Sequence, residues 1–178
     1  MASAISHPAV VLALAPIFRS VPRRLLWLGA LCSVIPDVDA VGFWLGIPYG
    51  HPLGHRGLTH SISFAALLAA ALAVFASGPD APRVAVFGFL FCCGASHGVI
   101  DAMTDGGLGV AFFAPFTNSR YFLPWRPIRV SPIGISGFLG RRGLDVLRTE
   151  LVWIWLPSLA FGAAAWLARR AAALLGSR

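Results

Sequence analysis

The sequence predicts an all-α, polytopic membrane protein: a helical bundle of four to five apolar helices with a long polar loop before the last helix. The first observation is composition, because 57% of the 178 residues are hydrophobic and the mean hydropathy is +0.77. The second is charge, because only 12% of the residues are charged, against about 25% in a typical soluble domain. So few charges cannot cover a surface that faces only water, and most of this surface is expected to face lipid. The length suggests a single domain over residues 1–178.

Five apolar segments are the candidate helices of this bundle. A helix that crosses a bilayer needs about 20 residues. Residues 61–77, 84–103 and 151–168 reach that length once a few flanking residues are added, so the last membrane span is expected at about 151–168. Residues 8–18 and 25–35 are too short to span by themselves. They could extend by several residues at each end, or pair as a short hairpin inside the bundle.

Short turns separate neighbouring segments. Pro22 falls between the first and second segments, and Gly78, Pro79 and Pro82 fall between the third and fourth. Connections this short predict antiparallel neighbours. A much longer polar stretch, residues 105–150, contains several glycines and prolines and six arginines. A loop of this length in a compact protein is usually functional.

The basic residues are all arginine, and the formal charge is +7. A basic balance can indicate nucleic-acid binding, but these arginines flank apolar runs or lie in the one long loop, so no nucleic-acid partner is expected. The three cysteines, Cys32, Cys92 and Cys93, lie in apolar runs and are expected to pack unpaired as small apolar residues. The first residues carry no basic side chain, so no cleavable signal peptide is expected.

Histidines and aspartates gather at the ends of the apolar segments. If successive segments alternate in direction, the positions before the first and third and near the ends of the second and fourth fall at one membrane face. Imidazole and carboxylate groups together suit zinc, manganese or iron. The sequence therefore predicts a metal site at that face. Its candidate residues are His7, Asp37, Asp39, His55, His60, His97 and Asp101.

These candidates differ in strength. His97 and Asp101 are four residues apart and share one helix face, and ionisable residues in an apolar segment are costly and usually functional. Asp39 is the weaker ligand candidate. It could instead act as a general base, orient a histidine, or form a structural salt bridge with Arg56. His51, in a glycine-rich loop, fits a plain interfacial residue best.

Arginines and aromatic residues alternate in the long loop. Arginine binds phosphate or carboxylate oxygens in a bidentate way. We therefore expect Arg120, Trp125, Arg126 and Arg129 to bind substrate, together with Arg56 as a catalytic residue that holds substrate oxygens. The alternative is a lipid-anchoring loop whose arginines meet anionic headgroups.

The motifs together resemble those of the inner-membrane metal-dependent hydrolase family of the YdjM type, once described as LexA-regulated. The resemblance covers residues 6–132, and its most specific string is His-Arg-Gly-Leu-Thr-His-Ser at 55–61. One departure is Asp105, where the family pattern has no fixed acid; it is either an extra ligand or without a role. The other matching pieces are Ser6-His7, Pro-Asp-Val-Asp at 36–39, His-Gly-Val-Ile-Asp at 97–101 with Thr104 and Gly107, and residues 112–116 and 120–128.

The resemblance implies a membrane-bound, metal-dependent hydrolase. The family is distantly similar to zinc-dependent phospholipase C and the S1/P1 nucleases, which implies phosphoester chemistry by analogy. The candidate ligands exceed the roughly three protein ligands that one catalytic zinc needs. One or two divalent ions are therefore expected, zinc first and manganese second. The position at a membrane face favours a membrane lipid or a lipid-linked substrate.

A membrane protein without hydrolytic activity is the alternative. A transporter is expected to hold its ligands near the bilayer midplane, on broken or repeated helices, whereas here they lie at segment ends and no inverted repeat is visible. A structural metal that staples short helices together would leave no open coordination position. No pattern in the sequence indicates an oligomeric state.

The arginines also bear on orientation in the inner (plasma) membrane. Short-loop arginines near helix ends favour the cytoplasmic side. The site side has Arg56 and the six loop arginines, most of them farther from a span, so the site is expected to face outward. The opposite side has Arg19, Arg23, Arg24, Arg83, Arg169, Arg170 and Arg178.

Overall fold

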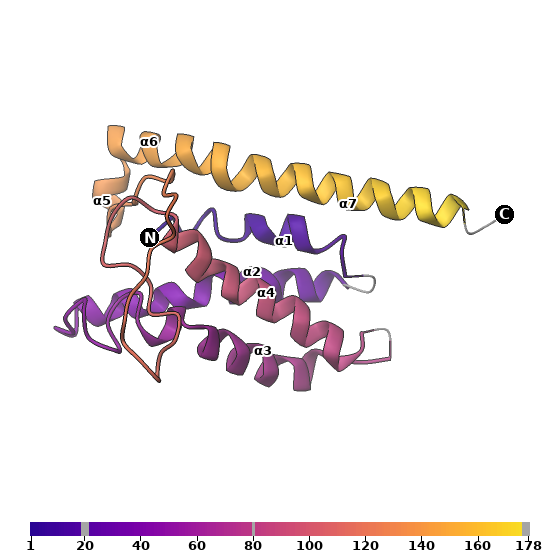
Figure 1. The fold of residues 1–178 in the computed structure, drawn as a ribbon, viewed down its shortest axis with the longest axis horizontal. Coiled ribbons are helices and arrows are strands. Elements are labelled where there is room, and N and C mark those ends of the chain that lie inside the picture. Colours follow the sequence, from indigo (N-terminus) through magenta and orange to yellow (C-terminus); the bar gives the residue numbers. More distant parts are fainter. Residues whose placement is uncertain (19–21, 80, 176–178) are drawn as a thin grey trace.

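The computed structural model describes residues 1–18, 22–79 and 81–175. Within these residues the chain is all helical and contains no β-strand, which confirms the predicted fold class. Helices run back and forth along one long axis, and most of the non-helical chain gathers at one end (Figure 1). The elements, in chain order, are α1 (Ala9–Leu14), α2 (Arg23–Val34), η1 (Ile35–Phe43), η2 (Leu58–His60), α3 (Ile62–Ala76), α4 (Arg83–Ala102), α5 (Ile135–Phe138), α6 (Arg141–Glu150), the π-helical turn η3 (Leu151–Trp155) and α7 (Leu156–Leu175).

Among the described residues, three helical runs are long and apolar enough to cross a membrane: Arg23–Phe43, Arg83–Ala102 and Arg141–Leu175. Of the two alternatives for residues 25–35, extension at the ends is therefore confirmed. The 3-10 turns of η1 continue α2 past Pro36, which lies where the α-helix changes to 3-10 geometry. The prediction that residues 61–77 span is wrong, because α3 has only 15 residues.

The last helix is longer than the predicted 151–168. Polar α6 joins α7 through the single π-helical turn η3, and the run extends over 35 residues, or about 50 Å at 1.5 Å per residue. The stretch predicted as a loop up to residue 150 therefore ends in helix from Arg141. What remains of the loop folds over the end of α4, where the main-chain N–H of Leu123 donates to the carbonyl of Ala102 at 2.9 Å.

Small residues let the central helices approach closely. α4 packs against α2 and α3, and Cys32, Ala69 and Cys93 are completely or almost completely buried among them. A β-carbon at Gly29 would lie 2.8 Å from the Phe89 ring, so only glycine fits the α2–α4 contact. The cysteines are free, as predicted.

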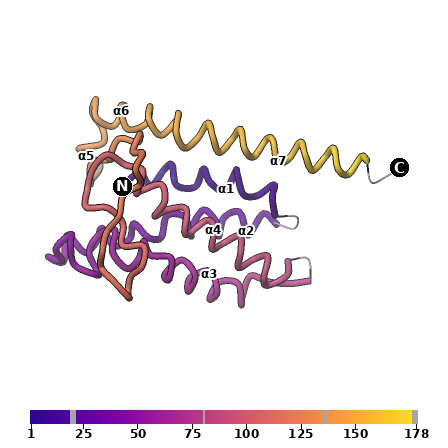
Figure 2. The backbone as a smooth tube through the Cα atoms, in the orientation of Figure 1, coloured from indigo at the N-terminus to yellow at the C-terminus, as the bar shows by residue number. Residues whose placement is uncertain are grey.

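The long C-terminal helix is held against the N-terminal segment. α1 and α7 lie side by side in the bundle (Figure 2). Gly162 makes this contact possible, because a β-carbon there would lie 2.3 Å from the carbonyl oxygen of Leu12. Arg169 donates to the carbonyl of Pro16 at 2.8 Å. Buried Glu150 accepts hydrogen bonds from the hydroxyls of Ser3 and Ser6 at 2.6 and 2.7 Å and from the main-chain N–H of Ser3.

This antiparallel arrangement brings distant parts of the chain to one end of the bundle. The N-terminal residues, η1, η2, the end of α4 and α6 all lie there, whereas α7 ends at the other (Figure 1). The candidate site residues lie at the end where these elements meet.

Candidate metal centre

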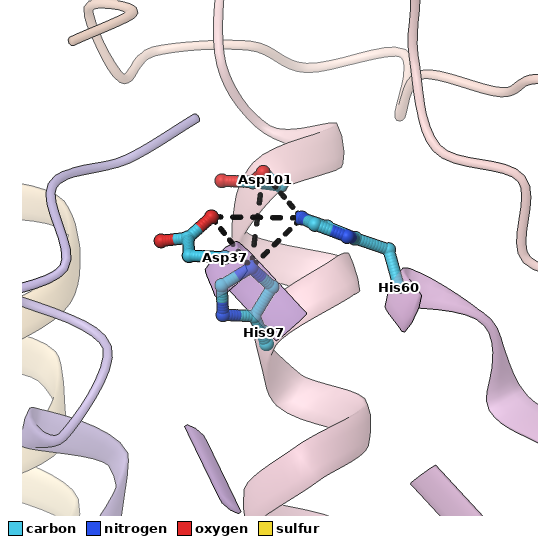
Figure 3. Close-up of side chains that lie close together, drawn as sticks. All are labelled: Asp37, His60, His97 and Asp101. Atoms are coloured by element: carbon cyan, nitrogen blue, oxygen red, sulfur yellow. Dashed lines mark hydrogen bonds and ion pairs between the residues drawn. The ribbon is translucent and has the colours of Figure 1, made fainter. Parts of the chain in front are cut away.

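Four side chains from three elements converge on one point at this end of the bundle. Asp37 comes from η1, His60 from η2, and His97 and Asp101 from one face of α4 (Figure 3). The Nε2 atoms of His60 and His97 are 3.0 Å apart, and Asp37 Oδ1 lies 3.4 Å from His97 Nε2. His60 Nε2 is 3.5 Å from Asp101 Oδ2. We call these four residues the first ligand group; one ligand atom from each lies within 4.8 Å of the others.

A second ligand group adjoins the first and shares His60 with it. Its members are Asp39, His55 and His60. Asp39 Oδ1 lies 2.6 Å from His55 Nδ1, and its Oδ2 lies 3.1 Å from His60 Nδ1. The hydroxyl of Thr59 donates to the same Oδ2 at 2.6 Å, and the main-chain N–H of Arg56 donates to it at 3.2 Å. Six of the seven candidate residues predicted from the sequence thus lie in the two groups, and they belong to the second, third and fourth apolar segments.

Hydrogen bonds fix which nitrogen of each histidine carries a proton. His97 Nδ1 lies 2.7 Å from the carbonyl oxygen of Ser33. A carbonyl only accepts, so Nδ1 is the donor and Nε2 presents a lone pair. Asp39 holds His60 in the same way through Nδ1. Two lone pairs that face each other across 3.0 Å repel unless a cation, either a proton or a metal ion, lies beside them.

Several buried polar atoms around this point have no hydrogen-bond partner among the described residues. They are both carboxylate oxygens of Asp37, Nε2 of His55 and both ring nitrogens of His7. More than 90% of buried polar groups in native proteins have a partner, and a buried charge without one is especially costly. Oδ1 of Asp37 lies 3.4 Å from Nε2 of His97 and 3.7 Å from Nε2 of His60. A cation between these three atoms, either a proton or a metal ion, would satisfy them.

His7 flanks the first ligand group without belonging to it. Its ring stacks on His97 with centroids 3.8 Å apart, and its Nε2 lies 3.6 Å from Asp101 Oδ1. Burial, together with the nearby His97, lowers the pKa of His7 to about 3, so this ring is neutral at physiological pH. His7 can therefore offer a lone pair at the edge of the centre.

The pKa of His60 is shifted in the opposite direction. Burial by itself lowers the pKa of His60, but the surrounding carboxylates of Asp101, Asp37 and Asp39 outweigh burial and raise the pKa to about 10. These carboxylates therefore stabilise positive charge at this ring. A metal ion that binds Nε2 of His60 has to displace the proton there.

Arg56 is a supporting residue of Asp101. Its guanidinium is completely buried and donates to Asp101 Oδ2 at 3.0 Å, to the carbonyl of Gly106 at 3.0 Å and to the hydroxyl of Thr104 at 2.8 Å. The salt bridge considered between Arg56 and Asp39 does not form, because only the main-chain N–H of Arg56 reaches that carboxylate. The expectation that Arg56 holds substrate oxygens is revised, since its side chain is bound within the protein.

The four loop residues predicted to bind substrate are engaged elsewhere. Arg120 donates to the carbonyls of His55 and Tyr49 at 2.8 and 3.0 Å and so ties the loop to the ligand segment. Cζ of Arg126 lies 4.7 Å from the centre of the Phe122 ring, and the rings of Trp125 and Trp153 meet edge to face with their centroids 4.5 Å apart. Arg129 forms an ion pair with Asp105 at 2.8 Å.

Asp105 and His51 lie outside both ligand groups. Asp105 accepts from Arg129 and from the main-chain N–H of Val130, so the interpretation as an extra ligand is not supported. His51 is exposed and accepts from the N–H of Leu53 within its own turn. Sequence reasoning missed the carbonyl of Ser33 as the partner of His97. No side-chain signal marks a main-chain carbonyl.

Comparison with known proteins identifies the family of the chain. The sequence profile of the family described as YdjM inner membrane protein matches residues 2–172. The chain belongs to this family. The inner membrane protein YbcI of Escherichia coli (strain K12) is 36% identical over 174 residues, which cover 96% of this chain and all of that protein. No solved structure matches the chain. Membership of the YdjM family is confirmed. The hydrolase activity and the similarity to zinc-dependent phospholipase C and the S1/P1 nucleases stay predictions.

Proposed function

We propose that this YdjM family protein is a metal-dependent hydrolase of the inner membrane that holds zinc, or alternatively manganese, at the two ligand groups. The observation that carries the proposal is the buried Asp37 carboxylate. It has no hydrogen-bond donor on either oxygen and faces the Nε2 atoms of two histidines. A bound cation would offset the negative charge of this carboxylate, and no described arginine contacts Asp37.

The residues present fit a divalent ion. The first ligand group offers two imidazole nitrogens and two carboxylates, a donor set that zinc accepts. The second ligand group adds the unpartnered Nε2 of His55 as a further donor, whereas the Nδ1 atoms of His55 and His60 are taken by Asp39. An ion bound there would supply Lewis-acid chemistry, the activation of water and of a substrate oxygen.

The remaining residues hold these donors in place. Asp39 bonds Nδ1 of both His55 and His60, so it directs their Nε2 atoms away from itself and raises their basicity. This contact favours the orienting role for Asp39 over a general base or a ligand. Arg56 offsets the negative charge of Asp101 and fixes its position. His7 completes the wall of the centre through its stack on His97.

An apolar cavity supports a lipid or lipid-linked substrate. Asp39 and Thr59 lie in the lining of a cavity of about 370 Å³ whose other walls are apolar, among them Ile35, Leu45 and Phe64. A hydrophobic chain could lie there with its polar end toward the ligand groups. We propose a phosphoester as the bond cleaved, by analogy with other hydrolases that use His and Asp sets.

A structural metal is the second candidate function. Its support is that the first ligand group could supply all four ligands of a closed tetrahedral site from buried side chains. The two functions differ in consequence. A structural ion stabilises the fold without any turnover, whereas a catalytic ion is needed for turnover.

We propose that the site faces outward from the inner membrane. The support is the set of short-loop arginines at the opposite end, namely Arg23, Arg24 and Arg83, with Arg169 and Arg170 near the end of α7. Arg19 and Arg178, which add to the same count, lie outside the described residues.

The proposal is tested by hydrolysis of a panel of phosphoesters, from p-nitrophenyl phosphate to phosphatidic acid and lipid-linked diphosphates. The detergent-purified protein is assayed after chelation and after zinc or manganese is restored. The matched variants are Asp37→Asn, at the centre, and His51→Ala, an exposed histidine outside it. We expect metal-dependent phosphate release by the wild type and His51→Ala and none by Asp37→Asn. Bound metal without turnover of any ester would contradict the hydrolase function and favour the structural one.

A further inference from the structure

A cavity of about 350 Å³ opens next to the second ligand group. Among the described candidate ligands, His55 is the one that lines it, beside Tyr49, Gly107 and Ser131. The other wall belongs to α6, through Arg142. This cavity is therefore a second approach to the ligand groups, besides the apolar cavity that Asp39 lines. A substrate group in this cavity would lie between His55 and Arg142.

Arg142 also lines a second cavity, of about 630 Å³, which adjoins the first. Three arginines and two aspartates line this larger cavity: Arg129, Arg142 and Arg148 with Asp105 and Asp145. Arg129 lies 2.8 Å from Asp105, and Arg148 lies 3.4 Å from Asp145. Arg142 has no ion pair among the described residues. One positive charge therefore remains unpaired, on Arg142, which lines both cavities together with Val130.

The other candidate arginines do not offer a free positive charge beside a cavity that contains a candidate ligand. Arg56 is buried and bonded to Asp101, and Arg120 is used by main-chain carbonyls. Arg126 lies over Phe122. Neither Arg56 nor Arg120 lines a cavity that contains a candidate ligand. Arg142 is exposed and lines the cavity together with His55.

We propose that Arg142 binds the anionic group of the substrate, a phosphoryl group, at the entrance to the second ligand group. The proposal rests on the hydrolase function above and names the residue that recognises the substrate's charge. A guanidinium presents parallel N–H donors that match two oxygens of a phosphate, which gives both affinity and orientation. The phosphoryl group belongs either to a lipid headgroup or to a soluble phosphate ester, because both share this chemistry.

The test compares Arg142→Gln with Arg141→Gln in the metal-loaded, detergent-purified protein. Arg141 is the neighbouring arginine, but it lines a different cavity, with Phe138 and Leu144. Binding of inorganic phosphate and of phosphatidic acid in micelles is measured by calorimetry, and metal content is measured on the same samples. Arg142→Gln should weaken binding about tenfold or more, the loss expected for a charge-assisted hydrogen bond, and Arg142→Lys should restore part of it. Arg141→Gln should bind as the wild type does.

Each outcome decides one question. Binding of inorganic phosphate that depends on Arg142 supports the proposal with a soluble ester as ligand. Dependence seen only with phosphatidic acid supports it with a lipid headgroup. Equal weakening in both glutamine variants, or no weakening in Arg142→Gln, overturns it. A wild type without bound metal refutes the hydrolase function instead, and the metal measurement separates that result from a failure of Arg142.

If turnover is found, the same pair of variants gives a kinetic test. A residue that only binds the phosphoryl group should raise KM about tenfold in Arg142→Gln, with a smaller change in kcat. An unchanged KM in that variant would overturn the assignment.

Discussion

Two polar regions lie at the same end of this bundle, and they differ in how their charges are satisfied. In and beside the ligand groups, the side chains of Asp37, His55 and His7 leave buried polar atoms without partners. In the loop and α6, the charges are mostly exposed, and the ion pairs there, such as that of Arg129 with Asp105, lie at the surface. Exposed charges can be solvated by water, whereas buried polar atoms without partners favour the binding of an ion.

The largest expected effect comes from Asp37→Asn. Metal binding should be lost. In zinc-loaded wild type the ion stabilises the fold by mass action, so the variant should unfold at a lower temperature than the wild type when zinc is present. After chelation the wild type loses that stabilisation, so the difference in unfolding temperature between the two proteins should shrink. Thermal unfolding with zinc and with chelator measures both differences.

The second effect concerns the buried ion pair of Arg56 and Asp101. Arg56→Gln leaves Asp101 buried without its cation, which typically costs about 3–5 kcal/mol. This loss of stability should appear both with and without metal, in contrast to the effect of Asp37→Asn. A variant that unfolds at the wild-type temperature after chelation would show that the pair does not stabilise the site end.

An intermediate effect is expected for the orienting carboxylate. Asp39→Asn should weaken zinc affinity about 10- to 100-fold, as is typical for partners that orient metal-bound histidines, without abolishing binding. Titration with a competing chelator measures the affinity. Asp105→Asn is the control, because this aspartate lies outside both ligand groups and its variant should keep wild-type affinity. A complete loss of metal in Asp39→Asn would make Asp39 a direct ligand.

The smallest effect is expected at the loop. Arg129→Gln breaks an exposed pair in which Arg129 is 67% and Asp105 31% exposed, and such pairs contribute about 0–1 kcal/mol. Metal content should not change. Loss of metal in this variant would contradict the division of the two regions.

The sequence predicts the fold class and the convergence of ligands because both depend on long-range patterns. Apolar segments that alternate in direction bring His97 and Asp37 to one end, whatever the details of packing. The helix ends were less predictable. Pro36 suggested an end, but it lies in the first turn of a 3-10 run that continues the helix to Phe43.

The finer roles depended on tertiary contacts that no local pattern reveals. Arg56 and Arg120 look alike in the sequence, yet one is buried against Asp101 and the other ties main-chain carbonyls together. The partner of His97 is a main-chain carbonyl, which any residue could supply. Arg142 is not predicted as a substrate residue, because its proposed role depends on which cavity α6 lines.

The metal content of the purified protein tests the central claim most directly. Plasma mass spectrometry on metal-replete wild type, Asp37→Asn and His51→Ala would measure it, with folding verified by thermal unfolding. The account predicts one to two equivalents of zinc or manganese in the wild type and His51→Ala, and loss of the ion at the first ligand group in Asp37→Asn. A folded, metal-replete wild type without bound divalent metal would contradict it.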